Sequence, residues 1–244
     1  MKIELTAYTP SPLRQMYLAA KRCTTATLDV NEEVDREEME RVVRRCIKSG
    51  HLTVAEFVDF TFSIEGITRS CSHQLVRHRH ASFCQMSERR VVLGTDEDEY
   101  YVNEEYLGYG GGCCSVEVEA KEALEKLFGK VPEGSENQIA YAFLEYRQLI
   151  KNGVPVEQAR AILPECTLTN LMMSANFREL MHICALRMCQ KAEEEIRELV
   201  TAMASEVSTI PADGPFLYSF LKPKCFQNER CTEAKPCGVY KWNN

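Results

Sequence analysis

Apolar and polar residues alternate along two segments near the start of the chain. Ile3, Leu5 and Ala7 alternate with polar neighbours, as in a strand that buries one face. The same period of two runs from Val58 to Glu65 and ends at Gly66, which makes it the clearest strand pattern in the sequence. Both segments are therefore predicted to be half-buried strands.

Helical spacing of apolar residues, with typical start and stop residues, predicts most of the other elements. Ser11 combines with Pro12 to mark a helix start, because a capping side chain precedes proline at the first helical position. Asp35 is a second candidate cap. The expected helices cover residues 11–23, 35–49, 68–76, 115–128, 136–151, 156–163 and 175–206, the last as one long helix. Residues 82–93 are expected to be extended, and the acidic, Tyr- and Gly-rich segment 96–112 is expected to be a mobile loop.

Helices outnumber strands in this pattern and do not alternate regularly with them, so the expected fold class is α+β rather than a doubly wound sheet. A length of 244 residues suits one large domain, or one domain with a small appendage. The segment 213–244 contains Pro, Gly and Cys and reads as a tail behind a main domain of residues 1–212. No stretch reaches the ~20 apolar residues that cross a membrane, and the N-terminus carries no secretory pattern, so the cytoplasm is the expected compartment.

Charge is distributed unevenly along the chain. The net charge of −7 is expected to repel nucleic acid and acidic membranes. From Ile67 to Arg90, by contrast, there are five arginines and one acid, Glu88, which gives a local charge of +4. Because a guanidinium holds phosphate or carboxylate with a rigid fork of donors, this segment predicts an anion site.

The segment from Gln74 to Arg89 holds the densest set of polar functional groups. Arginines can neutralise phosphates, glutamine amides can pair with the edge of a planar ring, and serine hydroxyls can bind beside anions. The residues in question are Gln74, Arg77, Arg79, Ser82, Gln85 and Ser87. Two alternatives stay open on these residues alone: an arginine-rich surface turn, and a non-catalytic phosphate- or RNA-binding module. The net charge and the lack of interleaved aromatic residues disfavour RNA.

The cysteine, histidine and glycine patterns do not match known metal or nucleotide motifs. Most of the twelve cysteines are expected to be reduced and packed as small apolar residues. Tail residues Cys225, Cys231 and Cys237 recur every six residues, which is unlike zinc spacing, and His73 and His78 lack further ligands at a suitable distance, so no metal is predicted. The run of glycines at 108–112 has no preceding apolar strand and is read as a loop rather than a dinucleotide motif.

The pattern Arg77-His78-Arg79, seven residues, Ser87 resembles the signature of the flavin-dependent thymidylate synthases. Further segments are similar to family landmarks, in order along the chain, and together the resemblance covers about residues 3–210. These segments are Gly50–Glu56, Glu157–Pro164, Asn176–His182, Leu186-Arg187 and Glu195–Arg197. Phe57 and Arg90 depart from residues that are common in the family. A cysteine-nucleophile thymidylate synthase is rejected, since Pro236-Cys237-Gly238 lacks the histidine of that family's Pro-Cys-His motif.

The resemblance implies a helix-rich single domain around an antiparallel sheet, assembled as a homotetramer. It also implies methylation of dUMP at C5 to give dTMP, with methylenetetrahydrofolate as carbon donor and with FAD and NADPH as reductant. NADPH would bind without a Rossmann unit. No enzyme nucleophile is required, so Ser87 is read as a ligand of phosphate or ring.

The resemblance also implies the site residues. Contacts to FAD are expected from Thr53, Glu56, Arg77, His78, Arg79, Gln85, Asn176, Arg178 and His182. Contacts to dUMP are expected from Gln74, Arg77, Gln85, Met86, Ser87, Glu88, Arg89, Arg160 and Arg187, with His51 near the flavin and the folate. Arg187 would be the catalytic residue, because a fixed guanidinium can stabilise the ionised uracil ring. From spacing alone, Glu157 and Arg160 also fit a surface ion pair.

Helix geometry predicts that the site is shared between subunits. On a straight helix over residues 175–206, Arg178 and His182 differ by about 40°, whereas Arg178 and Arg187 point about 180° apart. The simplest arrangement is a helix between subunits that gives Arg178 and His182 to one site and Arg187 to another. No proline or glycine lies between them to cause a kink.

Overall fold

The computed structural model describes residues 1–106, 114–129, 131 and 133–239. The chain forms two compact units. Unit 1 consists of residues 1–64, 74–84 and 172–244, and unit 2 of residues 65–73 and 85–171. Helices and a four-stranded antiparallel sheet, with the strand order β1-β2-β4-β3, confirm the α+β class.

Two strands lie close to the segments in which alternating apolar and polar residues predicted them. These are β1 (Lys2–Tyr8) and β2 (Asp59–Thr68), and β2 continues two residues past Gly66. From Asp59 to Glu65 every second side chain is buried, namely Phe60, Phe62 and Ile64, so one face of this part of β2 lies in the core as predicted. β1 pairs with β2, and the Thr6 hydroxyl donates to the carbonyl of Thr61 across this pair at 3.1 Å.

The expected extended segment 82–93 forms only a short strand, β3 (Ser82–Gln85), and β4 (Leu168–Asn176) was not predicted. In β4, Leu171, Met173 and Ala175 are buried and alternate with more exposed residues. Met172 is one of the exposed residues, so the local sequence reads as a continuous apolar run and its period of two is hidden.

Five helices lie close to their predicted positions: α1 (Pro12–Arg22), α2 (Arg36–Lys48), α3 (Arg69–Leu75), α5 (Cys114–Leu127) and α6 (Glu136–Lys151). Asp35 caps α2 as expected, since its carboxylate accepts from the backbone N–H groups of Glu37 and Glu38. Ser11 makes no capping bond through its side chain. The expected helix 156–163 is a short α7 (Val156–Ala159) followed by a 3-10 turn, η2 (Arg160–Ile162), and a second 3-10 helix, η1, covers Leu52–Phe57.

The prediction of a mobile loop at 96–112 is wrong for its first eleven residues, which form α4 (Asp96–Tyr106). Residues 107–112 lie outside the described part of the chain. Thr95 and Asp98 form a reciprocal cap, in which each side chain accepts the backbone N–H of the other at 3.2 and 2.8 Å. The first turn is entirely acidic, and negative side chains stabilise the positive end of the helix dipole. An acidic composition therefore marks a helix start here.

The single helix expected over 175–206 is also wrong. Asn176 ends β4, and its side chain caps α8 (Phe177–Arg187) by accepting the N–H of Glu179 at 2.9 Å. A second helix, α9 (Glu194–Ser208), begins after a break of six residues that contains no glycine or proline. The two helices pack against each other, an arrangement that one straight helix cannot make.

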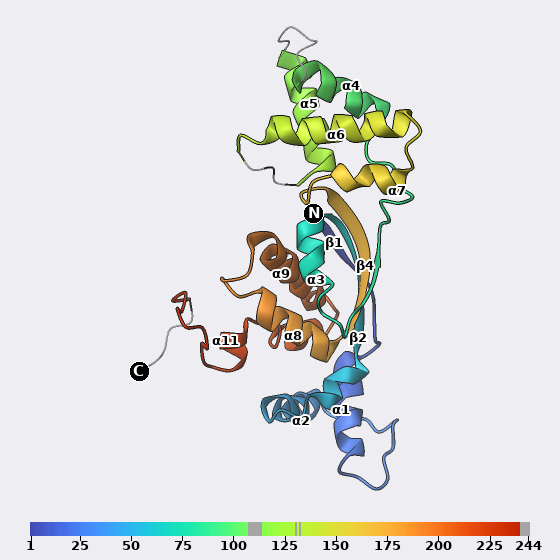
Figure 1. The fold of residues 1–244 in the computed structure, drawn as a ribbon. Coiled ribbons are helices and arrows are strands. Elements are labelled where there is room, and N and C mark those ends of the chain that lie inside the picture. Colours follow the sequence, from blue (N-terminus) through green and yellow to red (C-terminus); the bar gives the residue numbers. More distant parts are fainter. Residues whose placement is uncertain (107–113, 130, 132, 240–244) are drawn as a thin grey trace. The chain divides into compact units, whose positions relative to one another are not determined.

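Within unit 1, α8 and α9 lie beside the strands (Figure 1), and α9 packs on β1. The expected tail begins with two short helices, α10 (Gly214–Tyr218) and α11 (Lys224–Gln227). Phe216, Leu217 and Leu221 are buried, so this first part of segment 213–244 belongs to the packed core of unit 1. Cys225 of α11 is partly buried, and burial together with nearby Cys231 raises the pKa of its thiol. The domain boundary at residue 212 stays a prediction.

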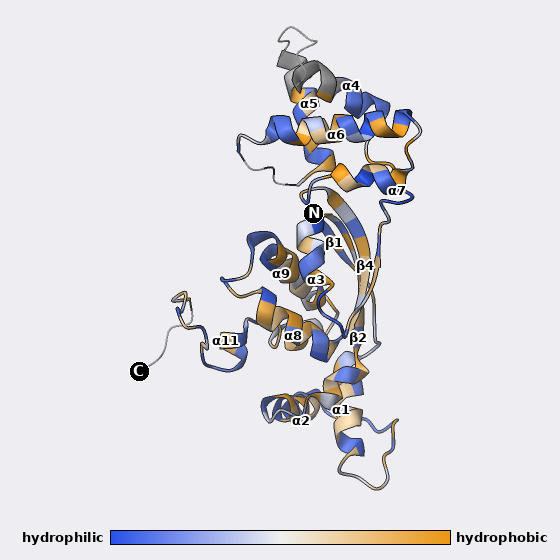
Figure 2. Cartoon of the chain, in the orientation of Figure 1, coloured by the Kyte–Doolittle hydropathy of each residue, from blue (hydrophilic) through white to orange (hydrophobic). Residues whose placement is uncertain are grey.

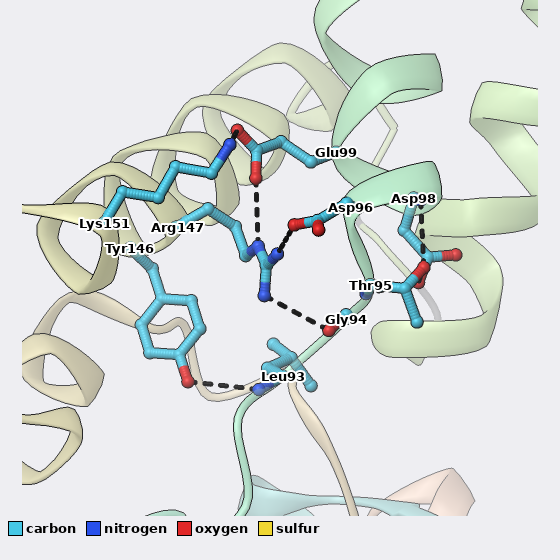
Figure 3. A network of polar contacts seen from close by, with 9 residues as sticks. All are labelled: Leu93, Gly94, Thr95, Asp96, Asp98, Glu99, Tyr146, Arg147 and Lys151. Carbon is cyan, nitrogen blue, oxygen red and sulfur yellow. Dashed lines mark hydrogen bonds and ion pairs between the residues drawn. The ribbon is translucent and has the colours of Figure 1, made fainter.

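Unit 2 has its own core between α4, α5 and α6. Val102, Leu124 and Phe143 contribute one buried side chain from each helix, and hydrophilic and hydrophobic residues alternate along α6 (Figure 2). A polar network joins α4 to α6 (Figure 3): the Arg147 guanidinium bonds Glu99 at 3.0 Å, Asp96 at 2.5 Å and the carbonyl of Gly94 at 3.3 Å. No helix in the described ranges is long and apolar enough to cross a membrane.

Candidate functional site

The Arg77-His78-Arg79 segment follows α3, buries its middle side chain and exposes the other two. The N–H of His78 bonds the carbonyl of Leu75 at 3.1 Å, and the N–H of Ala81 bonds the carbonyl of His78 at 3.1 Å. These two turns bury His78, which is 5% exposed, and leave Arg77 and Arg79 on the surface. Among the residues that the structure describes, neither arginine makes an ion pair, so both guanidinium groups are available to an anion.

His78 is the centre of a buried cluster in unit 1. Its Nε2 accepts a hydrogen bond from Nε of Arg187 at 3.0 Å, and its Nδ1 lies 3.6 Å from Oε1 of Glu179. The ring meets the ring of His182 edge-on, with 5.8 Å between centroids. Burial lowers the pKa of His78 to about 4, and the charges of Arg187 and His182 act in the same direction. His78 is therefore neutral at pH 7, as an acceptor of the Arg187 bond must be.

Arg187 is the last residue of α8, and three contacts hold its guanidinium. Besides the bond to His78, its NH1 donates to the side-chain oxygen of Gln74 at 3.3 Å, and its NH2 donates to the backbone carbonyl of Gln74 at 3.1 Å. The amide of Gln74 in turn donates to the carboxylate of Glu193. Four predicted site residues, Gln74, His78, His182 and Arg187, are thus brought together in one chain.

Two acidic residues of this cluster were missed by sequence reasoning. Glu179 lies three residues after Asn176, and such spacing reads as a helix-capping pair, which gives no sign of a contact with His78. Glu193 lies in the break between α8 and α9, within what had been expected to be an unbroken helix. Neither residue could be found without the tertiary structure.

A second group of predicted residues in unit 1 lies where η1 contacts α8. Arg178 forms an ion pair with Glu56, and both side chains are about half exposed. His51 and Thr53 are exposed at the start of η1. Asn176 is partly buried, and its side-chain oxygen is used by the cap of α8. Apart from Asn176, this group presents polar side chains to solvent.

The remaining predicted residues belong to unit 2. Gln85 donates to the hydroxyls of Ser72 at 3.0 Å and Thr169 at 3.2 Å. Glu88 pairs with Arg69 at 3.4 Å, and Ser87 is exposed. Met86 and Glu88 line a cavity of about 200 Å³, together with the apolar segment 91–93 and Asn170.

Arg89 and Arg160 meet at Glu157. The carboxylate of Glu157 pairs with Arg89 at 3.0 Å, while Nε of Arg160 donates to the backbone carbonyl of Glu157 at 3.3 Å. The spacing of Glu157 and Arg160 had fitted an ion pair on one helix face, but the acid pairs with Arg89 instead. Within the described ranges, no group of three or more His, Cys, Asp or Glu side chains is arranged to hold a metal ion.

Comparison with known proteins places this arrangement in a family. The family model described as thymidylate synthase complementing protein matches residues 4–211. A flavin-dependent thymidylate synthase of Clostridium tetani is 32% identical over 98% of this chain and 93% of the relative. Another, of Sulfurisphaera tokodaii, is 35% identical over 97% of this chain and 83% of the relative.

A solved structure has the same fold. The flavin-dependent thymidylate synthase of Helicobacter pylori, complexed with FAD and dUMP, superposes with a TM-score of 0.71 over 91% of this chain and 100% of that chain. The two are 22% identical, so this likeness concerns the fold. The family model and the sequence relatives span nearly the whole chain, and they show that the chain belongs to the flavin-dependent thymidylate synthase family.

Proposed function

We propose that this chain methylates C5 of dUMP at sites that its subunits share within a homotetramer. The activity follows from membership in the family: the chain is a thymidylate synthase that uses FAD, with methylenetetrahydrofolate as carbon donor and NADPH as reductant. The observation that carries this conclusion is the match along 97–98% of the chain to relatives that are 32–35% identical. The roles of single residues below are proposals.

The chemistry of the donor set in unit 1 fits FAD. Arg77 and Arg79 are exposed cations that make no ion pair in the described part of the chain, and a diphosphate requires such donors. Arg178 is held at the surface by Glu56, and the Thr53 hydroxyl is exposed near it on η1. We assign to these residues the binding of FAD, which supplies hydride chemistry when bound.

Four further residues complete the proposed FAD contacts. They are His78, His182, Asn176 and Gln85. His182 is exposed and lies edge-on to His78, so the ring of His182 can reach a ligand, whereas His78 is buried with its ring nitrogens facing Arg187 and Glu179. Asn176 acts by fixing the start of α8, from which Arg178 and His182 project.

Arg187 is proposed as the catalytic residue, and its contacts explain why it suits this role. A guanidinium has five N–H donors, and three of them are used by His78 and Gln74. The other two remain for a ligand. When C5 of uracil becomes nucleophilic, negative charge develops on the ring, and a cation that is already fixed in place stabilises that charge without reorganisation.

The residues of unit 2 are proposed to hold dUMP. Arg89 and Arg160 meet at Glu157, and the half-exposed ion pair with Arg89 contributes at most about 1 kcal/mol, so a phosphate can replace the carboxylate at a small loss of free energy. Ser87 offers an exposed hydroxyl, while Gln85, Met86 and Glu88 shape the segment that carries it. His51, exposed before η1, is assigned to the folate side. A cytoplasmic location is part of the proposal.

The experiment is a reconstitution. Purified protein should carry a yellow flavin absorbance and should form dTMP from dUMP when methylenetetrahydrofolate and NADPH are both present. Leaving out either co-substrate should stop product formation. Flavin-loaded protein that forms no dTMP with all components present would refute the assignment, and a colourless protein that binds RNA would favour the non-catalytic alternative.

Each single replacement of a cysteine should leave measurable dTMP formation, because no thiol nucleophile is proposed. Loss of all activity from one such change, in protein that remains folded, would point to a cysteine mechanism.

A further inference from the structure

We propose that Glu179 is a positioning residue that fixes the tautomer of His78 and, through it, the orientation of Arg187. This inference rests on the proposed role of Arg187 and adds a residue that is assigned no role in the resemblance. It concerns only side chains of unit 1.

The first step concerns the proton on His78. A neutral imidazole carries one N–H, and the other nitrogen accepts. Nε2 accepts from Nε of Arg187 at 3.0 Å, so the proton must lie on Nδ1. That nitrogen faces Oε1 of Glu179 at 3.6 Å, the one acidic group within ion-pair distance of the ring in the described residues. A carboxylate oxygen attracts an N–H and repels a lone pair, and it therefore favours this tautomer over the other.

The second step concerns burial. Glu179 is 6% exposed and His78 is 5% exposed, so water screens their interaction little. A separation of 3.6 Å is longer than a hydrogen bond, but the attraction at this distance is sufficient to rank two tautomers, and a small ring movement closes it. Burial, together with the charges of Arg187 and His182, lowers the pKa of His78, so the ring stays neutral beside the Glu179 carboxylate.

The third step concerns Arg187. With the opposite tautomer, Nε2–H would face Nε–H of Arg187, and two donors would oppose each other at 3.0 Å. The guanidinium would keep only its two bonds to Gln74, which allow it to turn. The tautomer of a buried histidine therefore decides whether Arg187 is held by three contacts or by two.

A purely structural role for Glu179 is the competing explanation. Asn176 and Glu179 have the spacing of a helix-capping pair, and the Asn176 side chain does cap α8 through the N–H of Glu179. That bond uses the backbone of Glu179 and leaves its carboxyl group to face His78. A structural role predicts lower stability alone, whereas a positioning role predicts an effect that depends on Arg187.

Glu179→Met is the main variant, because it keeps the length of the side chain and removes the acceptor. Glu179→Gln keeps one oxygen and removes the charge. Ile183→Val is the matched control, since Ile183 is buried in the same helix and its shortening loosens packing without changing the cluster.

The first readout is the tautomer itself. Solid-state ¹⁵N spectra of histidine-labelled protein, which has five histidines, should show His78 protonated on Nδ1 in the wild type. His78→Gln identifies its signals. In Glu179→Met a large share of His78 should carry the proton on Nε2. The share in Glu179→Gln should lie between those of Glu179→Met and the wild type, and Ile183→Val should match the wild type. A folded Glu179→Met with an unchanged spectrum would overturn the proposal. If Glu179→Met does not fold, Glu179→Gln takes its place, and a Glu179→Gln spectrum identical to that of the wild type would overturn the proposal.

The second readout is a double-mutant cycle. Glu179→Met should lower kcat about 10- to 100-fold, the range typical of residues that orient a functional ligand, with a smaller change in KM for dUMP. In an Arg187→Ala background the same change should cost less than about twofold, because Glu179 acts through Arg187. Equal losses in both backgrounds would identify a structural residue. If wild-type protein forms no dTMP, the proposed function fails, and the spectra still decide the role of Glu179.

Discussion

Nε of Arg187 donates a hydrogen bond to Nε2 of His78 at 3.0 Å, so the end of α8 is tied to the centre of the Arg-His-Arg segment. The two residues are 109 positions apart in the chain. A guanidinium held by such a bond is oriented before any substrate arrives, which is the condition under which a charge stabilises a transition state most effectively. The proposed catalytic residue and the family signature thus form one structural group.

Arg187→Ala should reduce dTMP formation by roughly 100- to 1000-fold, corresponding to loss of one preorganised donor of about 3–4 kcal/mol. FAD should remain bound, because the residues proposed for FAD are unchanged. Arg187→Lys should restore only part of the rate, since an ammonium group lacks the planar fork. Steady-state kinetics and the flavin absorbance measure both effects. Arg197→Ala is the control, because Arg197 lies on α9 and its side chain, among the described residues, bonds the carbonyl of Ala192 alone. Near-normal turnover of Arg187→Ala would remove Arg187 from the reaction.

His78 should make the protein less stable as the pH falls. The pKa of His78 is lowered from 6.5 to about 4 in the folded state, so the unfolded chain binds more protons between these values. The contribution is complete above pH 6.5 and is lost on descending to pH 4, with a slope of at most about 1.4 kcal/mol per pH unit. Denaturant unfolding of wild type and His78→Gln should therefore converge at low pH. His80→Gln, at an exposed histidine two residues away, should leave the wild-type pH dependence unchanged.

Arg178→Ala should weaken FAD binding without unfolding the protein. A charge-assisted hydrogen bond contributes about 1.5–3 kcal/mol, so the Kd for FAD should rise about 10- to 100-fold. The Arg178–Glu56 pair is half exposed, and its loss should change the free energy of unfolding by less than about 1 kcal/mol. Lys21→Ala removes another partly exposed ion pair, with Glu38, and should leave FAD binding unchanged. Equal affinity for FAD in Arg178→Ala and wild type would contradict the assignment.

Arg147→Met should loosen unit 2. Arg147 is 8% exposed and bonds Asp96 and Glu99 at the start of α4, so its removal leaves Asp96 without this partner and, among the described residues, leaves Glu99 paired with Lys151 alone. The expected cost is roughly 1.5–3 kcal/mol, the contribution of a hydrogen bond to a charged group. Hydrogen exchange of the α4 amides should accelerate accordingly, while Lys121→Ala, which removes an exposed pair on α5, should cost about 0.5 kcal/mol. Unchanged exchange in α4 would show that the network does not hold the helix.

Local sequence was sufficient for elements whose pattern repeats without interruption. The strand at Val58–Glu65 alternates strictly, and the helix after Asp35 has a standard cap, and both were predicted close to their observed limits. Strand β4 was hidden because Met172 places an apolar side chain on its exposed face. The break between α8 and α9 contains no helix-breaking residue, and it depends on packing of the two helices against each other, which a local pattern does not contain.

The functional site, like the fold, was predicted only in part from the sequence. The Arg77-His78-Arg79 pattern identified the segment, because residue type and spacing are properties of the sequence. Burial of His78 between two exposed arginines, and the contact with Glu179 across 101 positions, arise from the packing of α8 against the segment that contains Gln74 and His78. The sequence therefore identified the residues of the site, whereas the side chains that they contact became known only from the structure.

The last prediction concerns sharing of the site between subunits. Arg178 and Arg187 are the second and last residues of α8, and nine positions at about 100° each turn their side chains to opposite sides of the helix. The contacts agree: Arg178 pairs with Glu56, whereas Arg187 lies against His78 and Gln74. His182 lies one turn after Arg178 on the same helix, about 40° away, and its ring also contacts His78, the residue that Arg187 bonds.

Complementation tests whether the two arginines serve different sites. Inactive Arg178→Ala and Arg187→Ala subunits, dissociated, mixed in equal amounts and reassembled, should regain up to about a quarter of wild-type activity, since random pairing gives one intact site in four. Each variant taken through the same treatment alone should stay inactive. Native mass spectrometry of differently tagged subunits verifies that mixed tetramers form. Mixed tetramers without activity would place both arginines in the same site, and a chain that remains a monomer in solution would exclude sharing altogether.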